Sequence, residues 1–234
     1  MSPTSTPLVN TRVAIIMGTA MSQRLEFIYQ PLVGIFEDRG YQVSVYSIPG
    51  LGLGSLESST KELDKIIFSN NKYHYILLGH SQGGVHALGL AAKHPKRVEA
   101  VFTFGTPHHG TMLASLGSWL DWVPSIKEMR AHSTHLHNLR ELKYSQERIH
   151  SLFTVFDQLV VPWFASTVHG SKNVILMPKS LHKLLRGIGL RADDEAELIH
   201  GYAEHLFIIW HKKFHSYILS TLDSIESSQL EIAS

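Results

Sequence analysis

The 234-residue sequence contains no cysteine, which excludes disulfides, cysteine-ligated zinc sites and thiol nucleophiles. It also lacks an excess of charge, because 21 basic and 20 acidic residues leave a formal net charge of +1. This balance argues against nucleic acid or an acidic membrane surface as a partner. The hydrophobic fraction of 44% and the charged fraction of 18% are ordinary for a globular protein with a sizeable core. We therefore expect one domain over residues 1–234.

Long hydrophobic runs are missing from the start of the chain. The first apolar run covers only Val13–Met17, and no basic residue precedes Arg12. A secretory signal or a membrane anchor would need a longer apolar segment, so we expect a cytoplasmic protein without a transmembrane segment. Histidine, by contrast, is abundant, and its 16 copies add positive charge as the pH falls through about 6.5.

The most informative stretch of the chain is residues 73–94. The apolar run Tyr75–Leu78 predicts a buried strand, and the Ala/Leu-rich residues 83–94 predict a helix. Between them, residues 79–83 read Gly-His-Ser-Gln-Gly, the pattern of a nucleophile elbow. Glycines at such a corner let strand and helix pass closely, and the turn exposes the serine oxygen beside a helix N-terminus. Ser81 is therefore the predicted nucleophile.

Strand and helix patterns alternate along the whole chain, which predicts a three-layer α/β fold with a mostly parallel, six-stranded sheet flanked by helices. Residues 111–147 have no strand pattern and are too many for a simple connection, so they predict a helical cap after the fourth strand. The predicted strands are residues 12–17, 41–48, 75–79, 97–104, 149–156 and 173–177. The predicted helices are residues 23–40, 56–69, 83–94 and 206–225, with short helices over 179–200 broken at Gly187 and Gly189.

A serine hydroxyl becomes a strong nucleophile only beside a base that a third group orients. Asp157 directly follows the fifth predicted strand, and His205 lies between the sixth strand and the last helix. We expect Ser81, Asp157 and His205 to act as a catalytic triad in this chain order. His200 is the alternative base, and the competing interpretation of Asp157 is a residue that starts a turn.

Acyl transfer also needs hydrogen-bond donors for the oxyanion of the tetrahedral intermediate. The predicted donors are the backbone N–H groups of Gln82, which follows the nucleophile, and of Thr19 in the loop after the first strand, with Ala20 as the alternative to Thr19. Tryptophans in the cap favour an apolar substrate pocket. The predicted pocket residues are Met21, His80, His108, Trp119 and Trp122.

Two further patterns suggest a cofactor, and neither is complete. His132, His135 and His137 share a helix face only in part and lack a carboxylate to complete a metal site, so we predict surface histidines. The glycine-rich residues 49–55 lack the Gly-Lys-Ser/Thr ending of a phosphate-binding loop and predict a loop at the end of a strand. We expect neither a metal nor a nucleotide cofactor.

From Val13 to about Leu219, the chain resembles the α/β-hydrolase superfamily and, within it, the small lipases and esterases. It departs from the family pattern in two places. Met17-Gly18-Thr19 stands where the family usually has His-Gly, and Glu204 instead of glycine precedes His205. The segments that carry the resemblance are Ile48–Gly52, the GHSQGG elbow at 79–84, the GTPHHG segment at 105–110, the acid motif at 157–162 and the base motif at 205–207.

This resemblance implies a serine hydrolase that cleaves carboxylic esters, such as small ester or lipid substrates, through an acyl-enzyme intermediate. Two alternatives use the same residues differently. One is an acyltransferase or thioesterase with the same triad, and the other is a binding protein that has lost catalysis, which the altered residues 17–19 suggest.

Overall fold

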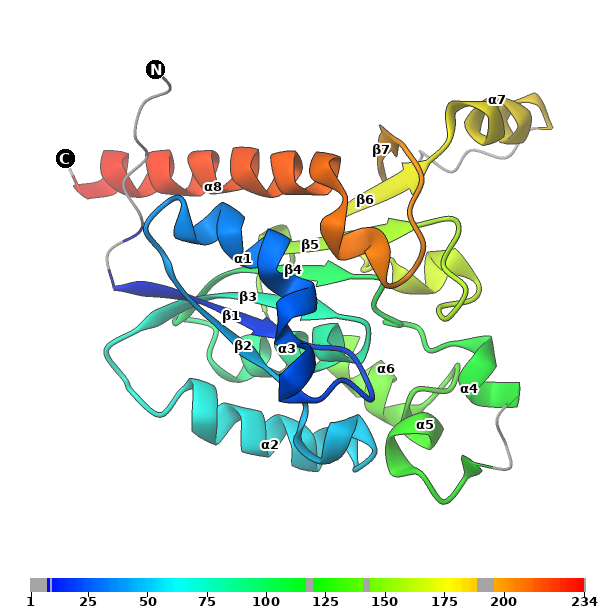
Figure 1. Ribbon diagram of the computed structural model, residues 1–234, viewed down its shortest axis with the longest axis horizontal. Coiled ribbons are helices and arrows are strands. Elements are labelled where there is room, and N and C mark those ends of the chain that lie inside the picture. The colour runs from blue at the N-terminus through cyan, green and yellow to red at the C-terminus, as the bar shows by residue number, and fades with distance from the viewer. Residues whose placement is uncertain (1–7, 9, 117–119, 141–143, 189–195, 234) are drawn as a thin grey trace.

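Seven strands form one sheet in the computed structural model, which describes residues 8, 10–116, 120–140, 144–188 and 196–233 (Figure 1). Each neighbouring pair is parallel, as predicted, and the order across the sheet is β2-β1-β3-β4-β5-β6-β7. The predicted number of six strands is therefore wrong by one. The strands are β1 (Thr11–Ile16), β2 (Gln42–Tyr46), β3 (His74–His80), β4 (Val98–Phe104), β5 (Ile149–Thr154), β6 (Lys172–Met177) and β7 (Glu197–His200).

Helices cover both faces of this sheet. The helices α1 (Gln30–Glu37) and α8 (Lys212–Ala233) lie on one face, and α2 (Leu56–Ile67) and α3 (Gln82–Lys93) lie on the other (Figure 1). Successive side chains of a strand point to opposite faces, so a strand covered on both faces is apolar throughout. In β3, Ile76 and Leu78 pack in the core beneath α1 and α8, whereas the alternate residues pack against α2 and α3.

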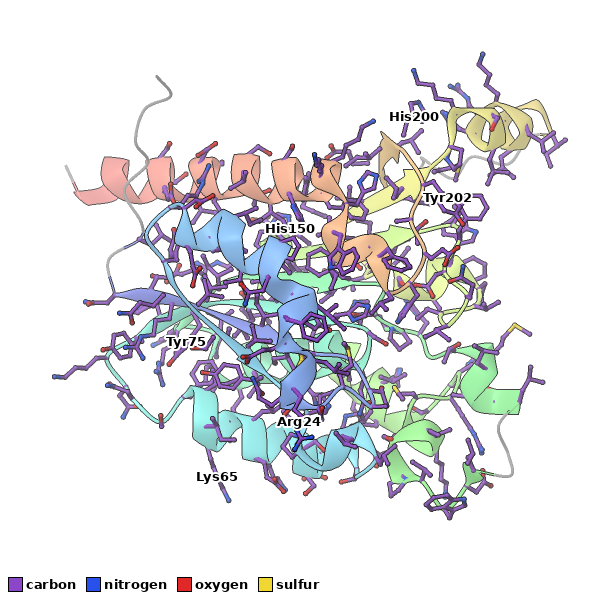
Figure 2. All side chains as sticks on the ribbon, in the orientation of Figure 1. Arg24, Lys65, Tyr75, His150, His200 and Tyr202 are labelled. Atoms are coloured by element: carbon purple, nitrogen blue, oxygen red, sulfur yellow. The ribbon has the colours of Figure 1, made fainter. Side chains whose placement is uncertain are left out.

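His150 of β5 shows how closely the first of these layers is packed. It is 7% exposed, its ring stacks on Phe102 of β4, and its Nδ1 lies 2.8 Å from the Tyr217 hydroxyl of α8 (Figure 2). Burial lowers the pKa of His150 to about 4, so the ring is neutral at physiological pH.

The first predicted helix, residues 23–40, is divided in two. A 3-10 helix, η1 (Gln23–Tyr29), leads into α1, which has Pro31 in its first turn and ends near Gly40. Proline has no N–H and clashes with the carbonyl four residues earlier, so one continuous α-helix cannot run through Pro31. The preceding turn therefore tightens into 3-10 geometry.

The region predicted as short helices, residues 179–200, holds the missing strand. It begins as α7 (Lys179–Gly187), but its last residues form β7 beside β6. Gly189 lies outside the described residues. A four-residue edge strand carries too little sequence pattern to be recognised, and its pairing with β6 is not a local property. The closing helix is likewise preceded by a separate 3-10 turn, η6 (Phe207–Trp210).

The segment between β4 and β5 is helical, as expected. It contains α4 (Met112–Leu116), α5 (Pro124–Glu128) and α6 (Thr134–Arg140), and the first two lie beyond the carboxyl ends of the strands (Figure 1). A 3-10 turn, η4 (Gln146–Arg148), leads from this segment into β5, and two others, η2 (Pro49–Gly52) and η5 (Trp163–Ser166), lie in other connections. None of the helices in the described part of the chain combines the length and apolar character required to cross a bilayer.

Candidate active site

The sharp turn between β3 and α3 presents Ser81 at the carboxyl edge of the sheet. Ser81 has φ 54° and ψ −126°, a conformation that L-residues rarely adopt, and its N–H donates to the carbonyl oxygen of Phe104. A Cβ on Gly83 would lie 2.2 Å from the carbonyl oxygen of Ile16. Only glycine therefore lets α3 start this close to β1, and the close approach fixes the turn that carries Ser81.

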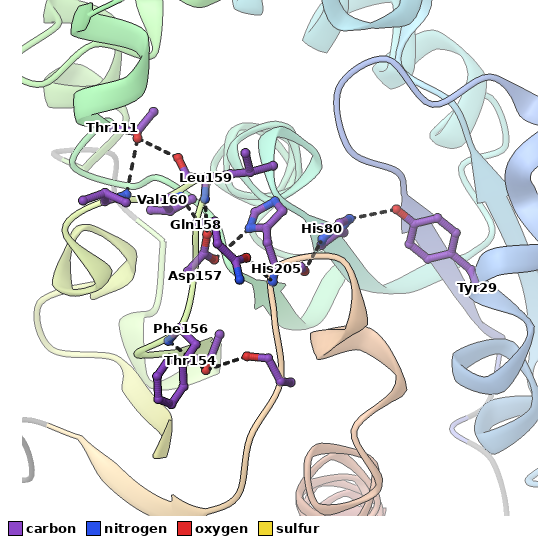
Figure 3. Close-up of polar contacts among 12 residues, drawn as sticks. Tyr29, His80, Thr111, Thr154, Phe156, Asp157, Gln158, Leu159, Val160 and His205 are labelled. Carbon is purple, nitrogen blue, oxygen red and sulfur yellow. Dashed lines mark hydrogen bonds and ion pairs between the residues drawn. The ribbon is translucent and has the colours of Figure 1, made fainter. Parts of the chain in front are cut away.

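Asp157 and His205 meet at the same edge of the sheet. Asp157 Oδ2 lies 2.7 Å from His205 Nδ1, and its Oδ1 accepts the N–H groups of Leu159 (2.9 Å) and Val160 (2.7 Å) (Figure 3). Both side chains are almost fully buried. A carboxylate accepts the Nδ1 proton, which leaves Nε2 as the basic nitrogen of a neutral His205.

Gly105, which follows β4, makes room for this pair. Its φ is +51°, and a Cβ there would lie 2.7 Å from Asp157 Oδ2 and 3.1 Å from His205 Nδ1. No role for this glycine is predicted from the sequence above. Its place at the start of the GTPHHG segment was the available signal.

Ser81 and His205 line one cavity of about 630 Å³. Most of its wall is apolar and comes from η1, the cap helices and the loop after Asp157. Among the described residues that line it, Glu204 carries the only carboxylate, and none is lysine or arginine. The apolar lining residues are Met21, Leu25, Ile28, Pro107, Leu113, Ala114, Leu120, Ile126, Met129, Leu159, Val160 and Leu206.

The loop after β1 contacts the elbow in the wall of this cavity. Thr19 donates its hydroxyl proton to Gln82 Oε1 (2.5 Å), and Gln82 Nε2 donates to the carbonyl oxygen of Gly52 (3.0 Å). Gln82 is the first residue of α3, so its backbone N–H has no acceptor within the helix. The N–H of Ala20 already donates to Leu51 (2.8 Å). This bond favours Thr19 over Ala20 as the second oxyanion donor.

Two of the predicted pocket residues line the cavity, and two others do not. Met21 and His80 line the cavity. His108 does not, because it is buried under the site with Nε2 3.1 Å from Thr103 Oγ1. Trp122 is 76% exposed and does not line the cavity, since the chain turns its buried neighbour Val123 inward instead. Trp119 lies outside the described residues.

The alternative base and the histidines of residues 132–137 do not line the cavity that contains Ser81. His200, the alternative base, ends β7, and its ring packs against His182 of α7. In the part of the chain that the structure describes, no three histidine, aspartate or glutamate side chains are grouped as metal ligands would be, His132, His135 and His137 included.

A family model, the alpha/beta hydrolase fold, matches residues 32–151, just over half of the chain. The chain belongs to this family. The matched part of this hydrolase-fold chain contains Ser81 and ends before Asp157 and His205. A comparison with curated protein sequences finds no match.

Solved structures agree on the fold. A monoacylglycerol lipase from Paleococcus ferrophilus is 17% identical with a TM-score of 0.56, and the match covers 94% of this chain and 96% of the lipase. Est1E from Butyrivibrio proteoclasticus is 13% identical with a TM-score of 0.55, covering 98% and 93%. The thioesterase domain from the curacin biosynthetic pathway is 14% identical with a TM-score of 0.54, covering 92% and 93%. At these identities the similarity concerns the fold alone.

Proposed function

We propose that this chain is a serine hydrolase of uncharged carboxylic esters with an apolar acyl group. The observation that carries the proposal is the meeting of three elements at one apolar cavity. These are the strained turn that presents Ser81, the buried Asp157–His205 pair, and two backbone N–H groups at residues 19 and 82 without an acceptor among the described residues. A strained nucleophile beside an oriented base is the arrangement that acyl transfer requires.

In the proposed reaction, Ser81 Oγ attacks the ester carbonyl carbon while His205 Nε2 takes the hydroxyl proton. Asp157 holds the Nδ1 proton and stabilises the positive imidazolium. The N–H groups of Gln82 and Thr19 donate to the oxyanion, and each such donor contributes about 3–4 kcal/mol of transition-state stabilisation. His205 then protonates the leaving alcohol. In the second half of the reaction, water attacks the acyl-enzyme while His205 takes its proton. His205 then returns that proton to Ser81 Oγ as the acid is released.

The cavity wall supports the choice of substrate. Its apolar lining stabilises a hydrocarbon acyl chain, and a volume of about 630 Å³ is in the range that holds a small molecule. Glu204 adjoins His205, which must reach the leaving group to protonate it. Its negative charge, with no lysine or arginine among the described lining residues, disfavours an anionic leaving group. An uncharged alcohol therefore fits better than a phosphate-bearing thiol carrier, which a thioesterase or acyltransferase would use.

Turnover of p-nitrophenyl esters from two to twelve acyl carbons tests this proposal, with Ser81→Ala as the paired variant. We expect kcat/KM to rise with chain length as the apolar wall is filled. The Ser81→Ala protein should be slower by a factor of about 10⁴ or more. Equal rates for the two proteins would contradict the proposal, and faster cleavage of a coenzyme A thioester than of the matched ester would favour the thioesterase alternative.

A further inference from the structure

Tyr29, in the last turn of η1, is buried behind the cavity. Its side chain has no exposed surface, and its hydroxyl oxygen accepts the N–H of Gly18 at 3.2 Å. The same oxygen lies 3.0 Å from His80 Nδ1 and 3.2 Å from Met21 Sδ. Tyr29 is thus in contact with the loop after β1. It also contacts His80, the residue that precedes Ser81 (Figure 3).

The protons in this cluster can be assigned. His80 Nε2 lies 3.0 Å from the main-chain carbonyl oxygen of His205, which can only accept, so Nε2 carries a proton. Burial, and then the nearby His205, lower the pKa of His80 to about 3, so the ring holds one proton at neutral pH. Nδ1 is therefore bare and accepts the Tyr29 hydroxyl proton. Met21 sulfur, a weaker acceptor, does not compete for it.

A continuous bridge results. It runs from the Gly18 N–H to the Tyr29 oxygen, from the Tyr29 hydroxyl to His80 Nδ1, and from His80 Nε2–H to the carbonyl oxygen of His205. One end lies beside Thr19, whose N–H is the proposed oxyanion donor. The other end is the main chain that carries the proposed base.

We propose that Tyr29 and His80 are positioning residues, which hold the oxyanion loop and the base in register with each other through this bridge. The inference rests on the proposed function, because it gives the bridge a role in the same reaction. The two ends come from opposite parts of the chain, after β1 and after β7, and these two strands are not neighbours in the sheet. The neighbouring contact of His205 N–H with Gln158 Oε1 is long, at 3.5 Å. A group misplaced by about 1 Å can slow a reaction about 10²-fold, so a fixed register matters for rate.

Tyr29→Phe tests the bridge, and Tyr41→Phe is its matched control. Tyr41 is also buried, also accepts a backbone N–H (from Leu8, 3.3 Å) and also donates to a buried acceptor (Glu226, 2.7 Å), but it precedes β2, at the other edge of the sheet. We expect Tyr29→Phe to lower kcat for an ester by 10- to 100-fold with KM changed less than about twofold. Tyr41→Phe should lose comparable thermal stability and keep kcat within about twofold. Equal kcat values for the two variants would overturn the proposal.

His80 provides a rescue experiment. Glutamine can donate from its amide nitrogen and accept at its oxygen, as the His80 ring does, whereas leucine can do neither. We expect His80→Leu to lose at least 30-fold in kcat and His80→Gln to recover at least a third of that loss on a logarithmic scale. No recovery by glutamine, with both proteins folded, would contradict a positioning role.

A spectroscopic measurement separates failure of the bridge from failure of the proposed function. Nitrogen-15 NMR of the full chain reports the His80 tautomer and the His205 Nδ1 proton without any substrate. We expect Tyr29→Phe to shift the His205 Nδ1 proton and speed its exchange with water, and Tyr41→Phe to change neither. If wild type hydrolyses no ester, the proposed function fails. If the His205 resonance is indifferent to Tyr29→Phe, the bridge fails.

Discussion

The elbow that carries Ser81 and the cap above it are built in contrasting ways. The elbow lies between β3 and α3, where nearly every side chain is buried and belongs to an extended core. The described helices of the cap have five to seven residues each, and a small cluster of five described buried residues joins them to the body. Its outer apolar residues are exposed, as Leu116 (72%) and Trp122 (76%) show. We therefore expect the core to fix the positions of the proposed reacting groups, and the cap to form the part of the wall that changes with the substrate.

The largest expected effect in the rigid region is that of Asp157→Asn. An amide has a single acceptor oxygen, which the N–H groups of Leu159 and Val160 would occupy, so its NH2 group would donate to Nδ1. His205 would then carry its proton on Nε2 and lose its basic Nε2. We expect kcat to fall by about 10⁴. Steady-state ester hydrolysis measures this loss. The control is Asp223→Asn, because Asp223 is an exposed residue of α8 that pairs with Arg39 and does not line the cavity. A loss below tenfold would mean that Asp157 only starts a turn.

The next largest expected effect is a loss in the free energy of unfolding at acidic pH. Burial lowers the pKa of His80 and His86 to about 3 and of His150 to about 4. These groups stay neutral in the folded chain, while the unfolded chain binds their protons below about 6.5, so stability is present above that pH and is lost as the pH falls from there toward about 3–4. We expect the free energy of unfolding to drop by roughly 3–4 kcal/mol between pH 7 and pH 5.5.

Urea unfolding at the two pH values measures this drop. His86→Gln removes one of these three buried histidines and should reduce the pH-dependent loss of unfolding free energy by about a third. An unchanged loss between the two pH values would contradict the role given to these histidines.

A pair of glycine substitutions tests the close packing behind the elbow. Gly83→Ala places a Cβ against the carbonyl of Ile16, so we expect a loss of about 2–3 kcal/mol in the free energy of unfolding. Gly34→Ala in α1 meets nothing within 4 Å and should stabilise the helix by about 0.5–1 kcal/mol. Denaturant midpoints measure both changes, and equal midpoints would mean that the elbow is not tightly packed.

The smallest effects are expected in the cap, and they concern specificity. Ile126 lines the cavity and Trp122 does not. Ile126→Ala enlarges the cavity on its apolar side. It should change the ratio of kcat/KM for long acyl chains to kcat/KM for short ones by about 5–10-fold, since each buried CH₂ contributes about 0.8 kcal/mol. Trp122→Ala should leave this ratio within about twofold. A larger change for Trp122→Ala would show that the cap closes over the site in a different arrangement.

The same contrast explains what the sequence could predict. Strands and helices with full periodic patterns, such as β3 and α3, were recognisable because their own apolar residues indicate that they are buried. Asp157 and His205, which were paired from their order in the sequence, also lie next to each other in the structure. The roles of both residues and of Ser81 stay predictions. β7 could not be recognised because a short edge strand depends on its neighbour. The break before α1, by contrast, could have been predicted from Pro31.

The directions of side chains in the cap could not be predicted from the sequence. Trp122 and Val123 are both apolar, and only the path of a short turn decides that valine points inward. The roles of Gly105 and of the Tyr29–His80 contact arise from segments that meet only in the folded chain. No local pattern marks such meetings.

We propose above all that the core holds Ser81 as an activated nucleophile. Intact-protein and peptide mass spectrometry after exposure to a fluorophosphonate ester measures this most directly, with wild type, Ser81→Ala and Asp157→Asn side by side. We predict one phosphonyl adduct per wild-type chain, on Ser81, none on Ser81→Ala, and labelling at least 10²-fold slower on Asp157→Asn. An unlabelled wild type, or equal labelling of Ser81→Ala, would contradict the account.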